Sequence, residues 1–528
     1  MPLRDLLYIF FSIIIILLGI LNKKIYLLLP LITIIHAIFN KFNTLIILIY
    51  IVVILSFFLT FMKNNSKKYV VITLSIILLI IYPLMIISLN NNYSSLNYEQ
   101  AFINLHKKIK SDYVLKNYKK VDFDLLYNKY ISDFKKASKE NNEKLYYLSL
   151  EKYLAEYHDA HINIENLFCN KRKVEIMKEY YQNNYGFSLI KLDNGDYVAV
   201  NVKISSEAYE KGIRNGTTIT KWQSKDIDLL LREKLPIITV NSPNISNKNA
   251  EEKYLGFYLS CLSTEKNTIT FINDDGYAEE ITLAPQKDGY EFIEDTITKF
   301  TKNNYKEDFY YQKINDNISY IRILNEKGSK KSIVKKMDNI VSYIKKDKTD
   351  KIILDLRNNH GGSNEIGSLI TSYFVKNKSL YLSEGILNKQ GKFIIKNKIY
   401  LNGQNKINKE VVVLINAGTM SAGEGIVYHL KQNDIKVAGI TSSNGSMATV
   451  KRKVIMPENI MVSYPEVACL DENNNVLIDS DNRRNKGIMP DIKIPLDKES
   501  INEIFSGNKD YELDFLINYL KNSKLNTN

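Results

Sequence analysis

Cysteine is scarce in this chain of 528 residues, which contains three, Cys169, Cys261 and Cys469. They are far apart and form no Cys-x-x-Cys pair, so a metal site built on cysteine is not expected. An odd count also argues against a disulfide framework, although one pair remains open. We therefore expect three small buried apolar residues, and we predict neither a metal ion nor a cofactor.

The distribution of charge does not indicate a nucleic-acid partner. The chain has 71 Lys and Arg against 58 Asp and Glu, a formal net charge of +13, but its basic residues form no stripe interleaved with aromatic side chains. Such a stripe is the usual sign of a nucleic-acid-binding surface. The modest basic excess suits an anionic surface instead, so we expect membrane lipid as a partner.

Long hydrophobic runs are concentrated in the first ninety residues, and crossing the ~30 Å hydrocarbon layer of a membrane takes ~20 apolar residues. The second run is short and contains Pro30 and His36, so it is either a full crossing or a re-entrant segment. We predict that residues 1–90 form a transmembrane region of four helices: Leu6 to Leu21, Ile25 to Phe39, Thr44 to Met62 and Tyr69 to Leu89.

Lysine is concentrated in the first and third loops between these runs. Because basic loops tend to stay in the cytoplasm, both chain ends are expected outside. A cleaved signal peptide is not expected, since three more runs follow the first and no small-residue cleavage site stands out. We predict a multi-pass protein of the cell membrane whose remaining residues lie on the extracytoplasmic side.

The rest of the chain divides into four segments. Residues 91–172 have Leu, Tyr and Lys at helical spacing, which predicts a helical region. Residues 173–290 contain short alternating runs with Asn-Gly and Asp-Gly turns, which are typical of strands. In residues 300–495 buried strands alternate with helical stretches, which favours a layered α/β core. Residues 496–528 are expected to form a helical tail.

Two stretches in the β-rich segment, "YGFSLIKL" and "SEAYEKGIRNGTTIT", resemble the carboxylate-binding loop and the short helix of a PDZ domain, in that order. The resemblance implies that backbone N–H groups hold the carboxylate of a peptide while the peptide adds as a strand. A small β domain with a closed or unused groove is the alternative. The predicted peptide-binding residues are Tyr185, Gly186, Phe187, Ser188 and Leu189.

A turn of small residues surrounds Ser421 in "EVVVLINAGTMSAGEG", where a strand ends and a helix begins. A serine hydroxyl needs a base, a group that orients the base, and donors for the developing oxyanion. The N–H of Ala422, unpaired at a helix N-terminus, is one candidate donor. The turn "DLRNNHGG" after another buried strand offers Gly361 and Gly362 as the second.

Three stretches in order, "IILDLRNNHGGS", "VVVLINAGTMSAGEG" and "KGIMPDIKI", resemble the carboxyl-terminal processing peptidases. These are serine peptidases with a PDZ domain inserted before a ClpP/crotonase-like core, and the resemblance covers roughly residues 100–495. It implies a protein or peptide substrate, Ser421 as the nucleophile, and Gly361 or Gly362 with Ala422 as oxyanion donors. One branch of the family uses a lysine where this chain has Asn444, although Lys451 and Lys453 keep that arrangement open.

The other branch, similar to the tricorn protease core, uses a histidine from a D-x-H motif, and "YHDAHINIE" contains Asp159 and His161. We predict His161 as the base, with His158 as a competitor. The position expected for the acid is Arg484, so the acid has to be chosen among neighbours. We select Asp481, with three alternatives: Asp479, Glu466 and Glu424.

Together these features predict a membrane-anchored serine endopeptidase that cleaves exported proteins or peptides near their C-terminus, with PDZ-like recognition of that end. The alternative is a catalytically inactive, membrane-tethered peptide sensor on the same fold. Asn444 and Arg484 are the residues that favour this alternative. The oligomeric state stays open.

Overall fold

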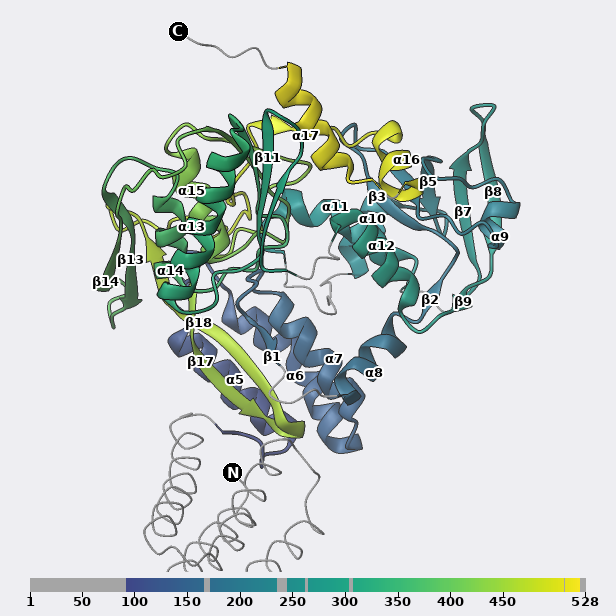
Figure 1. Cartoon of the computed structure of the whole chain (residues 1–528). Helices are drawn as coiled ribbons and strands as arrows, with labels where there is room; N and C mark the ends of the chain where they lie inside the picture. The colour runs from purple at the N-terminus through teal and green to yellow at the C-terminus, as the bar shows by residue number, and fades with distance from the viewer. Residues whose placement is uncertain are drawn as a thin grey trace, which may run out of the picture.

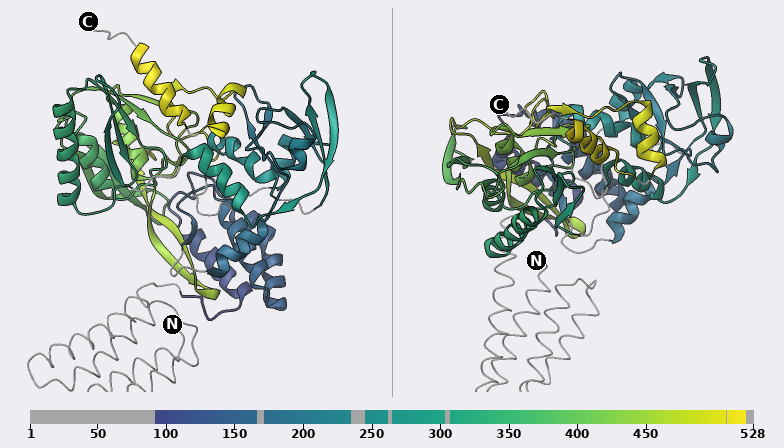
Figure 2. Two further views of the ribbon diagram at one scale, coloured as in Figure 1. Left: turned by 45° about the vertical axis from the view of Figure 1, so that its right-hand side comes forward. Right: turned by 45° about the horizontal axis from the view of Figure 1, so that its top comes forward.

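The computed structural model describes residues 92–165, 171–234, 245–261, 265–302, 307–507 and 509–522. Within them, a helical bundle lies at the N-terminal end and an α/β core lies above it (Figure 1). A β-rich segment lies beside the core, and the two further views in Figure 2 show the same arrangement.

The N-terminal bundle is held together by aromatic side chains. The ring of Phe102 stacks on Phe134 with 4.0 Å between centroids, and it meets Tyr153 edge-on. Each long helix begins at a cap whose side chain accepts a backbone N–H, which satisfies a donor that the helix leaves unpaired: Asn97, Asp122 and Asn142. The helices are α5 (Tyr98–Asp112), α6 (Phe123–Glu140), α7 (Glu143–Ala155) and α8 (Lys171–Tyr180).

The β-rich segment contains a four-stranded sheet in the order β6-β5-β7-β8, a β3–β4 hairpin and a short β2–β9 pair. Trp222 is fully buried at the centre of its core. Helix α11 packs against β3 so closely that a Cβ on Gly256 would lie 2.5 Å from the carbonyl oxygen of Leu189. The elements are β2 (Asn183–Asn184), β3 (Ser188–Lys191), β4 (Tyr197–Val200), α9 (Glu207–Glu210), β5 (Ile219–Trp222), β6 (Lys225–Asp226), α10 (Ile227–Lys234), α11 (Lys248–Leu259), β7 (Asn267–Ile272), β8 (Ala278–Leu283) and β9 (Gln286–Lys287).

The core is built on a six-stranded sheet in the order β10-β11-β12-β15-β16-β19, parallel except for β10. Both faces are covered: Ile352 and Leu354 of β12 face one cluster, and Ile353 faces another. Strands buried on both faces are typical of parallel sheets, and the predicted mixed α/β core agrees with this architecture. The elements are β10 (Phe309–Lys313), β11 (Ile318–Ile323), α13 (Lys330–Asp347), β12 (Lys351–Asp355), α14 (Asn364–Ser372), β15 (Glu410–Leu414), α15 (Ala422–Lys431), β16 (Lys436–Gly439) and β19 (Ile492–Lys493).

A second sheet connects the core to the N-terminal bundle. Its long hairpin, β17 with β18, extends from the core down to α5 (Figure 1). Strand β1 pairs with β18 in the register Asn163 to Ser463, which fixes the chain just before β1 against the core. The strands are β1 (Asn163–Glu165), β13 (Ser379–Leu387), β14 (Phe393–Leu401), β17 (Thr449–Met456) and β18 (Ile460–Leu470).

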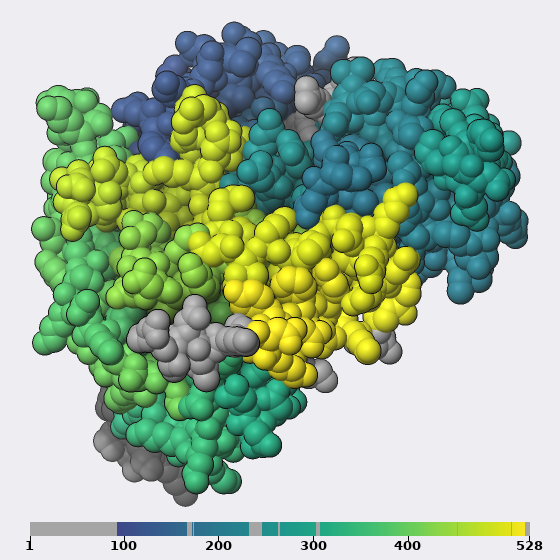
Figure 3. All heavy atoms as spheres, turned by 90° about the horizontal axis from the view of Figure 1, so that it is seen from above, coloured from purple at the N-terminus to yellow at the C-terminus, as the bar shows by residue number. Residues whose placement is uncertain are grey.

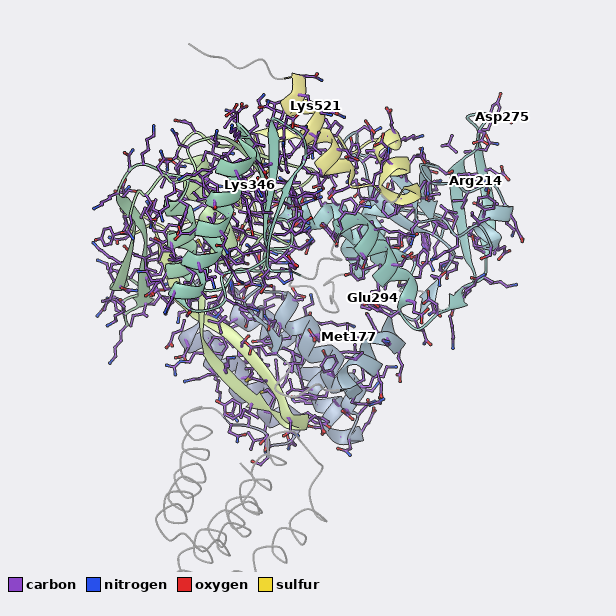
Figure 4. The ribbon with its side chains drawn as sticks, viewed as in Figure 1. Met177, Arg214, Asp275, Glu294, Lys346 and Lys521 are labelled. Atoms are coloured by element: carbon purple, nitrogen blue, oxygen red, sulfur yellow. The ribbon has the colours of Figure 1, made fainter. Side chains whose placement is uncertain are left out.

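The C-terminal helices α16 (Lys498–Ser506) and α17 (Tyr511–Asn522) lie where the core meets the β-rich segment, as the view from above shows (Figure 3). Helix α16 packs against β4 and against α12 (Glu291–Thr301). Before α17, the carboxylate of Asp510 receives two hydrogen bonds from the buried guanidinium of Arg357, at 2.8 and 2.6 Å. Lys521 marks the exposed end of α17 (Figure 4).

The prediction of a four-helix transmembrane region and a multi-pass membrane location is corrected here. Across the described residues, no helix is long and apolar enough to cross a membrane. The two longest, α6 and α13, have 18 residues each and carry many charged side chains, whereas a crossing takes ~20 mostly apolar residues. The four predicted spans in residues 1–90 lie outside the described residues, so the structure gives them no support.

The close contact between α11 and β3 predicts that replacing Gly256 by alanine changes stability in the direction opposite to that in an exposed helix. In an exposed helix, replacing glycine by alanine stabilises by ~1 kcal/mol. Gly256→Ala is expected instead to lower the free energy of unfolding by about 1–3 kcal/mol, because the added methyl overpacks the contact with Leu189. Thermal unfolding measures the effect, with Glu252→Ala on the same helix as the control. A raised melting temperature for Gly256→Ala would show that α11 is not held against β3.

Candidate active site

Ser421 ends the turn after β15 and directly precedes α15. Its backbone has φ 56° and ψ −130°, an unusual conformation for a residue other than glycine, at a cost on the order of 1–3 kcal/mol. Its N–H donates to the carbonyl oxygen of Ser446 at 2.8 Å, and the N–H of Met420 donates to that of Asn359 at 2.9 Å. These bonds hold the strained turn, and Ser421 lines an open cleft.

His161 reaches Ser421 from a segment 260 residues away in sequence, and its Nε2 lies 3.1 Å from Ser421 Oγ. The backbone around it is fixed, because the N–H of His161 donates to Asp159 Oδ1 at 2.9 Å and that of Ala160 donates to Ser446 Oγ at 3.0 Å. With 9% of its surface exposed, His161 has little freedom to turn away. The structure therefore brings together the predicted nucleophile and the predicted base.

Two fully buried carboxylates, Asp159 and Asp479, lie near His161. Asp159 Oδ1 is 3.7 Å from His161 Nδ1, and its Oδ2 accepts the hydroxyl of Tyr113 at 2.7 Å. Asp479 Oδ1 accepts the N–H of Met447 at 2.9 Å. Neither Asp479 Oδ2 nor His161 Nδ1 has a hydrogen-bond partner in the part of the chain that the structure describes.

The two carboxyl groups have opposite pKa shifts. Burial acts to raise the pKa of Asp159, but His161 and the ammonium group of Lys119 outweigh it and hold that pKa below its usual range. Burial, together with the negative charge of Asp159, raises the pKa of Asp479. Lys119 is itself buried, and its Nζ donates to the carbonyl oxygen of Ser480 at 2.9 Å. Asp159 is therefore the carboxylate that remains charged beside the imidazole.

The acid selected from the sequence, Asp481, lies elsewhere. Its carboxylate accepts a hydrogen bond from the backbone N–H of Arg483 at 2.9 Å and forms an ion pair with the guanidinium of Arg483 at 3.4 Å. Asp481 therefore closes a turn at the surface. Glu466, one of the alternatives, pairs with Arg452 at 2.7 Å. Among the described residues, no contact joins either carboxylate to the imidazole of His161.

The third alternative, Glu424, is fully buried in the first turn of α15. It accepts the first two of four successive N–H groups in residues 445–448, at 2.7 and 2.9 Å, and Asp479 accepts the next two, at 2.9 and 3.2 Å. Residues 445–448 are called the clamped loop below. Because this loop carries Ser446, the two carboxylates fix the carbonyl oxygen that binds the N–H of Ser421.

Asn444 stands where the other branch of the family has its lysine. Its backbone N–H donates to the carbonyl oxygen of Thr419 at 2.9 Å, and its Nδ2 donates to that of Ala417 at 3.2 Å. It therefore ties the clamped loop to the turn before Ser421. Lys453 pairs with Glu165 rather than with the serine, and the side chain of Lys451 lies outside the described residues.

The turn after β12 packs against Ser421. Gly361 has a φ of 85°, and a Cβ there would lie 2.6 Å from the Cβ of Ser421. Its N–H is already bound, donating to Asn359 Oδ1 at 2.8 Å. The N–H groups of Gly362 and Ala422 have no partner within the described residues, and Gly362 lines the cleft. Two of the three predicted oxyanion donors are thus available, whereas Gly361 permits the close approach.

The residues predicted to bind a peptide terminus are buried rather than open: Tyr185, Gly186, Phe187, Ser188 and Leu189. The N–H of Gly186 donates to Asn184 Oδ1 at 2.9 Å. Helix α11 lies against β3, the strand along which a peptide would add. Peptide binding by these residues therefore stays a prediction.

The cleft at Ser421 has a volume of about 750 Å³ and is lined by residues from several separate segments. His161 and Ser421 meet on its wall, and His360 lies on the wall as well. In the described residues there is no group of three or more His, Cys, Asp or Glu side chains that could hold a metal ion. The chemistry available at this site is nucleophilic attack by a serine with histidine as base.

The comparisons with known proteins indicate the class of protein. Residues 317–494 match the model of Peptidase family S41, and the chain is accordingly a serine-type peptidase. The comparison with curated proteins gave no match.

The fold is similar to that of solved structures. Mature CPAF complexed with lactacystin is 13% identical with a TM-score of 0.53, over 80% of this chain and 97% of that one. Mature CPAF is 14% identical with a TM-score of 0.53, over 81% and 98%. The tricorn protease is 16% identical with a TM-score of 0.37, over 80% of this chain and 36% of that one. At these identities the CPAF structures show a shared fold.

The clamped loop predicts a pH dependence of stability. Burial raises the pKa of Glu424 to about 8 from 4.5, against the opposing effect of hydrogen bonds from the hydroxyl of Ser443 and from the N–H groups of Gly445 and Ser446. Between these two values the folded state holds a proton that the unfolded state has lost, so Glu424 makes stability fall as pH rises. Glu424→Gln removes this titration, and its melting temperature is expected to fall less than that of the native chain between those pH values. Parallel pH curves for the two proteins would contradict the assignment.

Proposed function

We propose that this serine-type peptidase uses Ser421 as its nucleophile and His161 as its general base. Ser421 Oγ attacks the carbonyl carbon of the scissile bond while His161 Nε2 takes the hydroxyl proton. The oxyanion is bound by the N–H groups of Gly362 and Ala422, where one such donor is typically worth ~10²- to 10³-fold in rate. The C–N bond then breaks as the imidazolium protonates the leaving amine, and water releases the acyl group by the same steps.

We assign the orienting role to the pair Asp159 and Asp479 rather than to Asp481. Asp159, the charged member, stabilises the imidazolium that forms during attack. Asp479 holds the clamped loop and leaves one oxygen unpaired close to the site. Lys119 keeps the charge on Asp159 at lower energetic cost, since a buried carboxylate without a partner would take up a proton.

The proposal rests above all on the distance of 3.1 Å between His161 Nε2 and Ser421 Oγ. The two residues are 260 positions apart in the sequence, yet both lie on the wall of one cleft. A strained serine backbone beside available N–H donors supports catalysis over peptide sensing. Strain of this kind costs free energy and gathers at functional sites.

We further propose that the enzyme cleaves its substrates near their C-terminus. Capture of that end by residues 185–189 would require α11 to leave β3, because Gly256 packs on the backbone of Leu189. The test compares two peptides that are identical except for a free or an amidated C-terminus. A lower kcat/KM for the amidated peptide supports recognition of the carboxylate, and equal values contradict it.

Ser421→Ala is expected to lower peptidase turnover by ~10⁶-fold, the usual consequence of losing the serine of a triad. The assay measures cleavage of a denatured protein together with labelling by a fluorophosphonate probe. Ser205→Ala, a change at an exposed serine in the β-rich segment, serves as the control and should keep both signals. Retained cleavage by Ser421→Ala would overturn the assignment.

Asp159→Asn and Asp479→Asn are each expected to lower kcat by ~10²- to 10⁴-fold, because a misoriented imidazole is a poor base. Asp481→Asn is the matched control on the neighbouring turn and should stay within about threefold of the native enzyme, as surface changes usually do. Circular dichroism shows whether each variant is folded. The opposite order, with Asp481→Asn the most damaging, would restore the acid selected from the sequence.

A further inference from the structure

The cleft beside Ser421 is acidic, although the chain as a whole carries a net charge of +13. Many charged side chains project from the outside of the molecule, as Lys346 and Lys521 do in Figure 4. The cleft wall is different: the described residues that line it include three carboxylates and no lysine or arginine. Those carboxylates are Glu165, Glu365 and Glu384.

The three carboxylates are not equivalent. Glu165 is neutralised by its ion pair with Lys453. Glu365 lies in the first turn of α14, where a negative charge also stabilises the helix N-terminus. Within the described residues, Glu384 has neither an ion pair nor a helix N-terminus to stabilise its charge. Among them, its carboxylate receives only neutral hydrogen bonds, from Asn364 at 3.4 Å and from Asn397 at 3.2 Å.

Glu384 is built into the rigid part of the site. It belongs to β13, where it lies opposite Asn397 of β14 and opposite Cys469 of β18. Asn364, which donates a hydrogen bond to Glu384, is the first residue of α14 and follows the turn that contains Gly361 and Gly362. Its carboxylate is therefore held at a fixed place on the cleft wall, among described residues that give it no ion pair.

Taking the proposed peptidase function as its basis, we propose that Glu384 binds a lysine or arginine side chain of the substrate close to the cleaved bond. A half-buried carboxylate with neutral partners gains more from a substrate cation than a carboxylate in open solvent does. The amide oxygens of Asn364 and Asn397 offer further acceptors for an ammonium or guanidinium group. Ile399, also on the wall, suits the alkyl stem of such a side chain.

The negative cleft also explains how a basic protein selects basic segments. Long-range repulsion from the surface disfavours them, so an attractive site has to act at short range, within the Debye length of ~8 Å at physiological salt. Glu365 adds to the field that draws a cation into the cleft. Glu384 then decides which side chain is held next to Ser421.

The test first maps the bonds cleaved in a denatured protein by mass spectrometry. Internally quenched peptides based on one such bond are then made with lysine, norleucine or glutamate at each flanking position. The native enzyme should prefer lysine to norleucine at one position by about tenfold in kcat/KM, the equivalent of ~1.4 kcal/mol. This preference should shrink as NaCl is raised from about 50 to about 500 mM.

Glu384→Gln is expected to lower the lysine-to-norleucine ratio of kcat/KM about tenfold. The matched control, Glu280→Gln, removes one exposed carboxylate of β8 and should keep the native ratio. Equal ratios in the native enzyme and in Glu384→Gln overturn the inference, and so does a native preference for glutamate. If the native enzyme cleaves nothing and a fluorophosphonate fails to label Ser421, the proposed function fails, and this inference fails with it.

Discussion

The parallel pairing of β12 with β15 is the constraint on which the rest of the site depends. Because Asp355 lies opposite Leu414, the two strands end side by side and their following turns must share one edge of the sheet. The turns pack so closely that a Cβ on Gly361 would lie 2.6 Å from that of Ser421. Glycine at this position is therefore what lets the turn after β12 approach Ser421 so closely.

The clamped loop holds the strained backbone of Ser421 in place, because the carbonyl oxygen of Ser446 accepts the N–H of Ser421. Two buried carboxyl groups would destabilise the fold if they had no hydrogen-bond partners. Glu424 and Asp479 instead receive four successive backbone N–H groups from residues 445–448. These four hydrogen bonds fix the backbone of the clamped loop, although Asp479 Oδ2 has no partner among the described residues. The fixed loop presents the carbonyl oxygen of Ser446 to Ser421.

Part of this arrangement could be predicted from the sequence, where local pattern carries the information. The alternation of buried strands and helices indicates the α/β core, and the glycine-rich turns after β12 and β15 indicate Ser421 and its donors. The acid could not be chosen in this way. Asp159 is close to His161 in the sequence, but only the fold buries its carboxylate beside Lys119 and brings the distant Asp479 near it. Tyr113, Lys119 and Ser446 have no local signal at all. The close packing of α11 on β3 depends on Gly256, which looks like an ordinary helical glycine in the sequence.

The segment before the last helix binds the turn that follows β12. Arg357, four residues before Gly361, is buried and binds Asp355 as well as Asp510, which begins the last helical segment. A buried guanidinium is costly unless its donors are satisfied, so removing Asp510 would take away two of its hydrogen bonds, while its bonds to Asp355 would remain. The strand, the turn and the C-terminal segment are thus energetically linked through one side chain.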